Sequence, residues 1–281
     1  MHSYEPISLL FTTKYKVRNP LLKPLIKYYW LLESQLPVNI CHKLLPVNNI
    51  DIIINLSNQI NYIKNEKVIN TGMMHFNGIQ KQHSRISQNG KISVMGISFF
   101  PHGIYPFLKI PISEFSDRTV CLDDIAKNFA NRIESQFNLN QTIEERIDII
   151  ETELLKYIDF ELINDRIIYL FNLFHGKEQL VSINDFCEQQ GINIKWLERT
   201  FLKYTGITPK SFKNINRFQN ISRQLLSSSE RKNLTILSHE NDYYDQTHFI
   251  KEFKKYTGCA PSNFLKEGIS VKEIMKNGHV I

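Results

Sequence analysis

The feature that most constrains the fold is an internal repeat in the C-terminal third. Residues 196–212, WLERTFLKYTGITPKSF, align without a gap with residues 248–264, HFIKEFKKYTGCAPSNF, at an offset of 52. Seven of the seventeen aligned positions are identical, and they fall on an apolar helix face, a helix end and the start of a further helix. A repeat of this kind indicates two copies of one supersecondary unit.

Each copy is predicted to be a helix that ends sharply and leads into another helix. In the first copy Leu197 and Phe201 lie four residues apart, so both face the same side of a helix. Gly206 then favours a helix end, because glycine adopts the left-handed conformation at little cost. Pro209 suits the first turn of the next helix, where a missing N–H group is not needed. The second copy repeats the pattern with Phe249, Phe253, Gly258 and Pro261.

A short helix is predicted upstream of each copy. In the first unit it spans residues 182–190 and begins at Ser182, a suitable N-cap, and Asn193 can cap the helix that follows. In the second unit it covers about residues 235–241, and Asp245 is the candidate N-cap of the next helix. A helix, a turn of a few residues and a second helix make up a helix-turn-helix.

A long helix is predicted to join the two units. Between 209 and 226 the apolar residues recur every three or four positions, which gives one continuous apolar stripe. Such a helix is roughly 27 Å long at about 1.5 Å per residue. It can hold two recognition helices apart by something near one DNA turn, about 34 Å. The stripe consists of Phe212, Ile215, Phe218, Ile221 and Leu225.

The positive charge of the chain is concentrated on the first unit and this connecting helix. The chain has 34 basic and 28 acidic residues, a formal net charge of +6. Residues 195–217 include six basic residues and only one acidic residue, Glu198, which gives a net charge of +5. Any one of them can be a solvated surface lysine or arginine, but the group favours a nucleic-acid partner. The six are Lys195, Arg199, Lys203, Lys210, Lys213 and Arg217.

The N-terminal residues show a different pattern. Residues 50–57 and 91–100 are β-branched runs that read as buried strands. Helical periodicity begins near residue 122, and the clearest helices are 145–158, with one apolar face, and 161–176. The apolar face of 145–158 is a candidate dimer contact, or it packs on its own domain.

These patterns predict an α+β chain of two domains. Residues 1–175 form a β-rich sensing or dimerisation domain with helices at its C-terminal end. Residues 178–268 form an all-α domain of two helix-turn-helix units joined by a long helix. The boundary is expected within 175–179. A length of 281 residues is enough for a separate hydrophobic core in each domain.

The second unit carries a recognisable motif. Residues 245–249 read DQTHF, Lys251 follows, and residues 257–261 read TGCAP. This pattern resembles the paired helix-turn-helix domain of the AraC/XylS family over about residues 178–266. The resemblance implies a transcriptional regulator that binds double-stranded DNA, with RNA polymerase as a candidate further partner. One departure is Asp242, which stands where the family usually has glycine.

The N-terminal part resembles a family domain as well. Residues 20–34, 45–57 and 94–125 are similar to a domain of unknown function that precedes this DNA-binding pair in many bacterial regulators. The resemblance covers about residues 15–130. It implies a β-rich sensing or dimerising domain and names no ligand.

The candidate DNA contacts are the residues of each recognition helix that do not face its own core. Arg199 can pair with guanine and Gln246 with adenine. Lys203, Lys254 and Lys255 suit phosphates. The whole predicted set is Ile194, Lys195, Glu198, Arg199, Lys203, Gln246, Thr247, Ile250, Lys251, Lys254 and Lys255.

Two alternatives concern the N-terminal domain. It senses a small-molecule effector, for which Trp30, Glu33, Tyr105 and Phe107 are the candidate ligand residues, or it acts without a ligand as a dimerisation or protein-binding domain. A metal-dependent enzyme is the competing class, built from the scattered side chains His75, His83, His102, Glu33 and Asp51. No HExxH or similar metal spacing occurs, and the four cysteines form no CxxC pair.

We therefore expect no catalytic residues, no metal and no cofactor. No stretch of about 18 apolar residues and no signal-peptide pattern occurs, so we expect a cytoplasmic protein without a membrane partner. The remaining candidate partner is a second copy of the chain.

Overall fold

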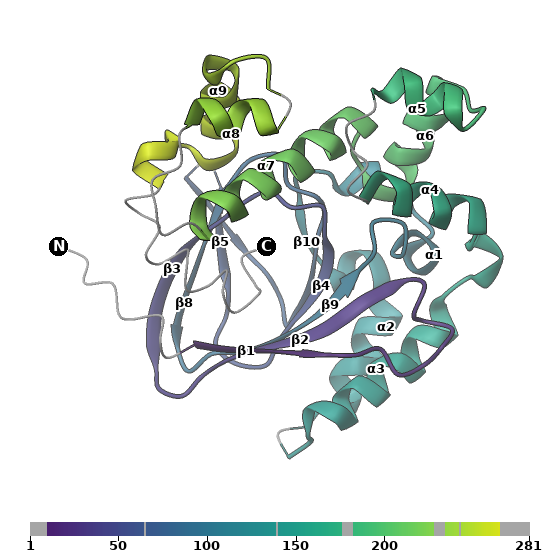
Figure 1. Cartoon of the computed structure of the whole chain (residues 1–281). Helices are drawn as coiled ribbons and strands as arrows, with labels where there is room; N and C mark the ends of the chain where they lie inside the picture. The colour runs from purple at the N-terminus through teal and green to yellow at the C-terminus, as the bar shows by residue number, and fades with distance from the viewer. Residues whose placement is uncertain are drawn as a thin grey trace.

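A computed structural model of the chain describes residues 10–64, 66–138, 140–175, 182–227, 234–241 and 243–264. Its N-terminal part is built on two antiparallel β-sheets, and its C-terminal part is helical (Figure 1). This confirms the predicted α+β class. The predicted boundary at 175–179 lies outside the described residues, apart from the helical residue 175.

The first sheet has six strands and the second has four. The first has the order β1 (Leu10–Tyr15), β2 (Ile26–Ser34), β9 (Ser93–Phe99), β4 (Ile50–Asn55), β7 (Met74–Asn77) and β10 (Thr119–Cys121). The second has the order β3 (Val38–Leu44), β8 (Ser84–Gly90), β5 (Asn61–Lys64) and β6 (Lys67–Asn70).

The central strands of the first sheet are buried on both faces. Successive side chains of a strand point to opposite faces. In β4, Ile52 and Ile54 pack into the large core shared with the helices, whereas Ile53 packs into a smaller core toward the second sheet. This explains why the run IDIIINLS is almost continuously apolar rather than alternating.

Three helices and two short 3-10 segments follow β9 in the chain, with β10 among them. They are α1 (Tyr105–Leu108), η2 (Ile112–Phe115), α2 (Leu122–Gln136), α3 (Ile143–Tyr157) and η3 (Phe160–Leu162). The apolar face of α3 is buried: Ile147, Ile150 and Leu154 are 0% exposed. These side chains belong to the core of their own chain, so this face of α3 is not a dimer contact.

The structure shortens one predicted helix. The run 161–176 divides into η3 and α4 (Asp165–His175). Asn164 separates them because its Oδ1 accepts a hydrogen bond from the backbone N of Arg166 at 2.9 Å, which is the geometry of a helix start. The periodicity alone does not show this new start.

The C-terminal helices follow the predicted order closely. They are α5 (Ile183–Gln189), α6 (Ile194–Thr205), α7 (Pro209–Ser227), α8 (Leu234–Glu240) and α9 (Gln246–Thr257). Helix α7 runs between the two helix pairs, with α5 and α6 at one end and α8 and α9 at the other (Figure 1). All five residues of its predicted stripe are buried.

The sheets and the first helix pair share one continuous hydrophobic core. Buried polar groups join them as well. Asn48, in the loop between β3 and β4, donates from Nδ2 to the backbone O of Phe212 at 2.8 Å and to Oδ1 of Asn216 at 2.6 Å. Both asparagines are almost fully buried, so these bonds hold α7 in a defined position against the N-terminal part.

Within the ranges that the structure describes, no helix is both long and apolar enough to cross a bilayer.

Candidate nucleic-acid interface

The first helix-turn-helix has the predicted caps. Ser182 Oγ accepts from the backbone N of Asp185 at 3.1 Å, and Asn193 Oδ1 accepts from the backbone N of Lys195 at 2.8 Å. Each side chain satisfies one of the N–H groups that a helix start leaves without a partner. Helix α6 ends at Gly206, which has a φ of 78°.

The second unit repeats this geometry. Asp245 Oδ1 accepts from the backbone N of His248 at 2.7 Å, and Gly258 ends α9 with a φ of 76°. Asp242, the residue that departs from the family pattern, lies outside the described residues.

A threonine before each glycine makes the two turns chemically equivalent. Thr205 Oγ1 donates to the backbone O of Phe201 at 2.8 Å, and Thr257 Oγ1 donates to the backbone O of Phe253 at 2.9 Å. Each hydroxyl also accepts from the backbone N two residues later, at 3.3 Å in both copies. Both threonines are fully buried. The repeated Thr-Gly pair therefore serves the helix stop, a role that the repeat alone did not reveal.

Aromatic side chains form the centre of each unit. The ring of Phe201 lies 4.6 Å from that of Phe171 and 4.7 Å from that of Phe174, centre to centre. The ring of Phe253 lies 5.4 Å from that of Phe218, on α7, and contacts further rings in its own unit. These contacts orient α6 and α9, so the opposite face of each helix is turned to solvent.

Most of the predicted DNA contacts lie on these exposed faces. In α6, Ile194, Lys195, Glu198, Arg199 and Lys203 are exposed, and in α9, Thr247, Lys251, Lys254 and Lys255 are exposed. Gln246 is half-buried, and its Oε1 accepts from Thr235 Oγ1 at 3.1 Å. Ile250 is half-buried against the core.

Two of the six basic residues between 195 and 217, Lys203 and Arg217, also take part in packing. The ammonium of Lys203 lies 4.6 Å from the centre of the Tyr105 ring, on α1. Arg217 on α7 forms an ion pair with Glu252 on α9 at 2.5 Å, and its guanidinium lies 3.9 Å from the Tyr243 ring. Arg217 thus holds the second unit on α7. A count of charges does not distinguish this packing role from a DNA contact.

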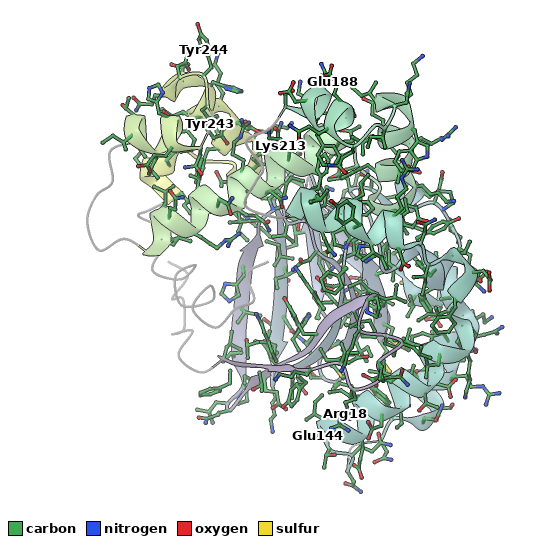
Figure 2. The ribbon with its side chains drawn as sticks, turned by 45° about the vertical axis from the view of Figure 1, so that its right-hand side comes forward. Arg18, Glu144, Glu188, Lys213, Tyr243 and Tyr244 are labelled. Carbon is green, nitrogen blue, oxygen red and sulfur yellow. The ribbon has the colours of Figure 1, made fainter. Side chains whose placement is uncertain are left out.

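Tyr244 is a candidate contact that the sequence patterns did not single out. It lies in the turn between α8 and α9 and is 89% exposed, and its side chain projects from the tip of the second unit (Figure 2). Such a hydroxyl beside a recognition helix suits a phosphate. The only sequence signal is an aromatic residue directly before the N-cap Asp245.

The two left-handed glycines of the first unit permit a matched test of packing. An alanine Cβ at Gly206 would lie 2.6 Å from the backbone O of Ile112 in η2, whereas at Gly191 (φ 59°) no atom of the described residues would lie within 4 Å of it. Gly191→Ala should therefore lower the free energy of unfolding by about 1 kcal/mol, the cost of the left-handed backbone. Gly206→Ala should lower it by about 2–4 kcal/mol, because the contact with η2 is lost too.

Chemical denaturation of both variants measures this difference. Equal losses at the two glycines would show that the packing of α6 on η2 contributes nothing to stability.

The structure does not bring the four candidate ligand residues together. Trp30 lines a cavity between the two sheets. Glu33 is exposed because it lies three positions further along β2, on the opposite face of the strand. Tyr105 and Phe107 belong to the core instead, where Tyr105 packs on Tyr204 with ring centres 4.9 Å apart.

The histidines of the metal-enzyme alternative are dispersed. His75 is bonded to Tyr62, His83 lies beside Gly258, and His102 bonds to the backbone O of Pro24. In the described part of the chain, no three side chains among His, Cys, Asp and Glu gather in a way that could hold a metal ion.

Comparison with known proteins agrees with this geometry. Residues 186–267 match a family model described as a helix-turn-helix domain, and residues 19–121 match a domain of unknown function, DUF6597. The uncharacterized HTH-type transcriptional regulator YidL of Escherichia coli (strain K12) is 33% identical over 89 residues, which are 32% of this chain and 29% of that protein. The match thus spans less than a third of this relative.

Solved structures show a weaker likeness. ToxT from Vibrio cholerae has a TM-score of 0.43 and 14% identity, over 92% of this chain and 98% of that chain. The AraC-like transcriptional activator CuxR has a TM-score of 0.23 and 16% identity, over 76% and 94%. These TM-scores are too low to assign a fold or a ligand to this chain. On the two domain matches and the repeated turn geometry, the chain combines a C-terminal helix-turn-helix domain of the AraC type with an N-terminal domain of unknown function.

Proposed function

We propose that the chain regulates transcription by binding specific DNA sequences through α6 and α9, each placed in the major groove. The observation that carries this proposal is the pair of equivalent helix-turn-helix units at the two ends of α7. Each unit has a buried aromatic centre and an exposed, mainly basic outer face. An α-helix fits the major groove of B-DNA, and two units on one connecting helix suit two successive groove segments.

The exposed residues divide by chemistry. Arg199 is exposed near the middle of α6, and Lys251 lies at the equivalent position of α9 at the repeat offset of 52. A guanidinium or ammonium at this position can reach the O6 and N7 atoms of guanine. Lys254, Lys255 and Tyr244 lie near the ends of α9 and suit phosphate oxygens.

We expect Arg199→Ala and Lys251→Ala each to weaken binding to the preferred DNA site by about 1–3 kcal/mol. The preferred site is first obtained by selection from random duplexes with the full-length chain. Affinities are then measured for the preferred and a scrambled duplex at one salt concentration, because phosphate contacts make binding salt-dependent. The base contacts are lost in the variants, so the preference for the selected duplex should fall.

Lys67→Ala is the matched control, since Lys67 is an exposed lysine on β6, in the sheets. It should leave both affinities unchanged. Wild-type affinity for the selected duplex in both Arg199→Ala and Lys251→Ala would refute the placement of α6 and α9, and a failure to select any sequence would refute specific binding itself.

The role proposed for the N-terminal part is to modulate this binding. Its shared core with α6 and the buried bonds from Asn48 to α7 give it direct contact with the first unit. A small-molecule effector is the form of modulation that the cavity between the sheets favours. The family resemblance adds RNA polymerase and a second copy of the chain as proposed partners, and the cytoplasm as the proposed location.

A further inference from the structure

A small cavity lies between the two sheets. It has a volume of about 140 Å³. Its lining comes from β2, β4, β7, β9 and β10 of the first sheet and from β3, β5 and β8 of the second. An apolar protein cavity of about 150 Å³ can hold benzene. A ligand of roughly six to ten non-hydrogen atoms therefore fits this space.

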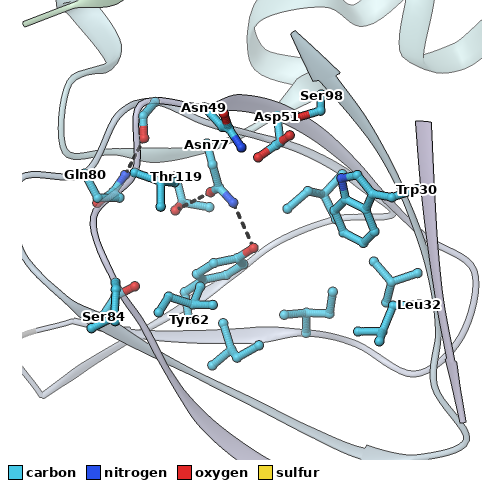
Figure 3. A pocket seen from close by; sticks show the side chains of 18 of the residues that line it. Trp30, Leu32, Asn49, Asp51, Tyr62, Asn77, Gln80, Ser84, Ser98 and Thr119 are labelled. Carbon is cyan, nitrogen blue, oxygen red and sulfur yellow. Dashed lines mark hydrogen bonds between the residues drawn. The ribbon is translucent and has the colours of Figure 1, made fainter. Parts of the chain in front are cut away.

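The cavity is polar at one end and apolar at the other. Asn49, Asp51 and Asn77 lie at the polar end, and Leu32 marks the apolar end (Figure 3). Asp51 is the one charged side chain among the described residues that line the cavity. A carboxylate or phosphate ligand would meet this like charge at short range, so the lining disfavours anions.

Most of the polar wall is already satisfied by internal hydrogen bonds. Thr119 Oγ1 donates to Asn77 Oδ1 at 2.7 Å, and Asn77 Nδ2 donates to Tyr62 Oη at 2.9 Å (Figure 3). The Tyr62 hydroxyl lies 2.8 Å from His75 Nε2. Burial lowers the pKa of His75 to about 3, so the ring is neutral and its Nε2 accepts a hydrogen bond from the Tyr62 hydroxyl. The hydrogen bonds that run from Thr119 to His75 therefore form without a ligand.

Asp51 is different because no counter-ion contacts it among the described residues, and within them its Oδ1 is buried without a hydrogen-bond partner. The cation that opposes its pKa shift is Lys27, whose Nζ donates to Asn49 Oδ1 at 3.1 Å. Burial raises the pKa of Asp51 to about 6, with Ser98, Lys27 and Trp30 acting in the opposite direction. An incompletely paired buried carboxylate is costly to keep charged, so a cationic ligand group would stabilise it.

Aromatic rings complete the surroundings of this carboxylate. Trp30 and Tyr28 line the same cavity. Tyr62, on β5 of the second sheet, lies across the cavity from Trp30 (Figure 3). Trp30 lies flat over its strand partner Gly96, where any Cβ would be 2.0 Å from the indole ring. Aromatic faces attract organic ammonium groups, and a carboxylate beside them adds an ion pair.

We propose that this cavity binds a small organic amine, with its ammonium group at Asp51 among Tyr28 and Trp30 and its apolar part toward Leu32. The occupied cavity also acts on the helix-turn-helix units through two loops at its rim. Asn49 lines the cavity and directly follows Asn48, which is bonded to α7. Ser84 also lines the cavity and directly follows His83. The His83 ring packs against Gly258, at the end of α9, so closely that an added Cβ there would lie 2.6 Å from it.

The binding step is tested with the full-length chain and probes of matched shape at pH 7.5. Butylamine, benzylamine and phenethylamine are compared with 2-phenylethanol and phenylacetate by isothermal calorimetry and thermal unfolding. At least one amine should bind and raise the Tm, and phenylacetate should do neither. Asp51→Asn should weaken amine binding at least tenfold, and Asp124→Asn, an exposed carboxylate on α2, should not change it.

Several results would overturn the binding proposal. They are no binding by any of the three amines, binding of phenylacetate as strong as that of the amines, and unchanged amine affinity in Asp51→Asn. Val94→Phe provides a second variant that keeps Asp51 and fills the apolar part of the cavity, and amine binding that survives it would place the amine elsewhere.

The coupling step rests on the proposed function and is measured separately. The bound amine should change the affinity of the wild-type chain for its selected DNA by at least threefold. Asn48→Ala should keep amine binding and lose this change, because the bonds to Phe212 and Asn216 are removed. An equal change in Asn48→Ala would overturn the proposed route. If no DNA is selected, calorimetry still decides whether the amine binds.

Discussion

Replacing Phe201 with alanine should lower the free energy of unfolding by about 3–5 kcal/mol, the usual cost of removing a buried phenylalanine side chain. Phe201 is 0% exposed and contacts the rings of Phe171, Phe174 and Phe212. Two of these rings belong to α4 and one to α7, so a single side chain joins the helix before the first unit to the helix after it. The cavity left by the substitution cannot close easily around three fixed rings.

Urea denaturation followed by far-UV circular dichroism measures this loss. Leu202→Ala is the matched control, because Leu202 is the next residue of α6 and is 37% exposed. The control should lose about 1 kcal/mol or less, since little apolar area leaves water there. Similar losses for both variants would mean that Phe201 does not hold the first unit in the packing described. Binding of the selected DNA by Phe201→Ala should fall together with its stability.

Replacing Asp51 with asparagine should stabilise the chain at high pH and not at low pH. Burial raises the pKa of Asp51 from its ordinary value of 3.8 to about 6, so the folded state binds the proton more tightly than the unfolded state. For a carboxyl group shifted in this direction, the folded state is favoured below pH 3.8 and loses stability as the pH rises through 6. A shift of about two units corresponds to roughly 3 kcal/mol.

The measurement is the difference in free energy of unfolding between Asp51→Asn and wild type, taken at pH 4 and at pH 8. This difference should grow by about 2–3 kcal/mol in favour of the variant between the two pH values. Lys27 and the Tyr62 and Tyr28 hydroxyls are the other titratable groups near Asp51, and all three are present in both proteins. Asp124→Asn should show no such growth. A difference that does not depend on pH would show that Asp51 is not a buried, incompletely paired carboxyl group.

The predicted core of the helical part agrees well with the structure because its signals are local. The stop at Gly206, the caps Asn193 and Asp245, and the stripe of α7 each depend on residues within a few positions of one another. Helix ends and amphipathic faces are determined by such short-range chemistry. The candidate DNA contacts follow from the same periodicity, since an outward face is defined once the inward face is known.

The four predicted ligand residues do not come together in the structure, because their placement depends on how the strands pair. Trp30 faces the cavity and Glu33 does not, since an odd number of steps along β2 reverses the side of the sheet. The sequence suggests Asp51 only as a metal ligand, and nothing near it in sequence indicates that its carboxylate lies beside Trp30. Strands distant in sequence bring these two residues together.

The order of the residues alone predicts the two helix-turn-helix units, their caps, the long helix between them and the exposed faces of α6 and α9. Each of these follows from spacings of three, four or fifty-two residues that any reader of the chain can measure. The contact of Lys203 with Tyr105 and the pairing of Arg217 with Glu252 emerge only when the chain is folded. The same is true of the cavity between the sheets, where Asp51 Oδ1 has no hydrogen-bond partner among the described residues. Helical periodicity depends on residues a few positions apart, whereas ion pairs and cavities depend on which distant segments the fold brings into contact.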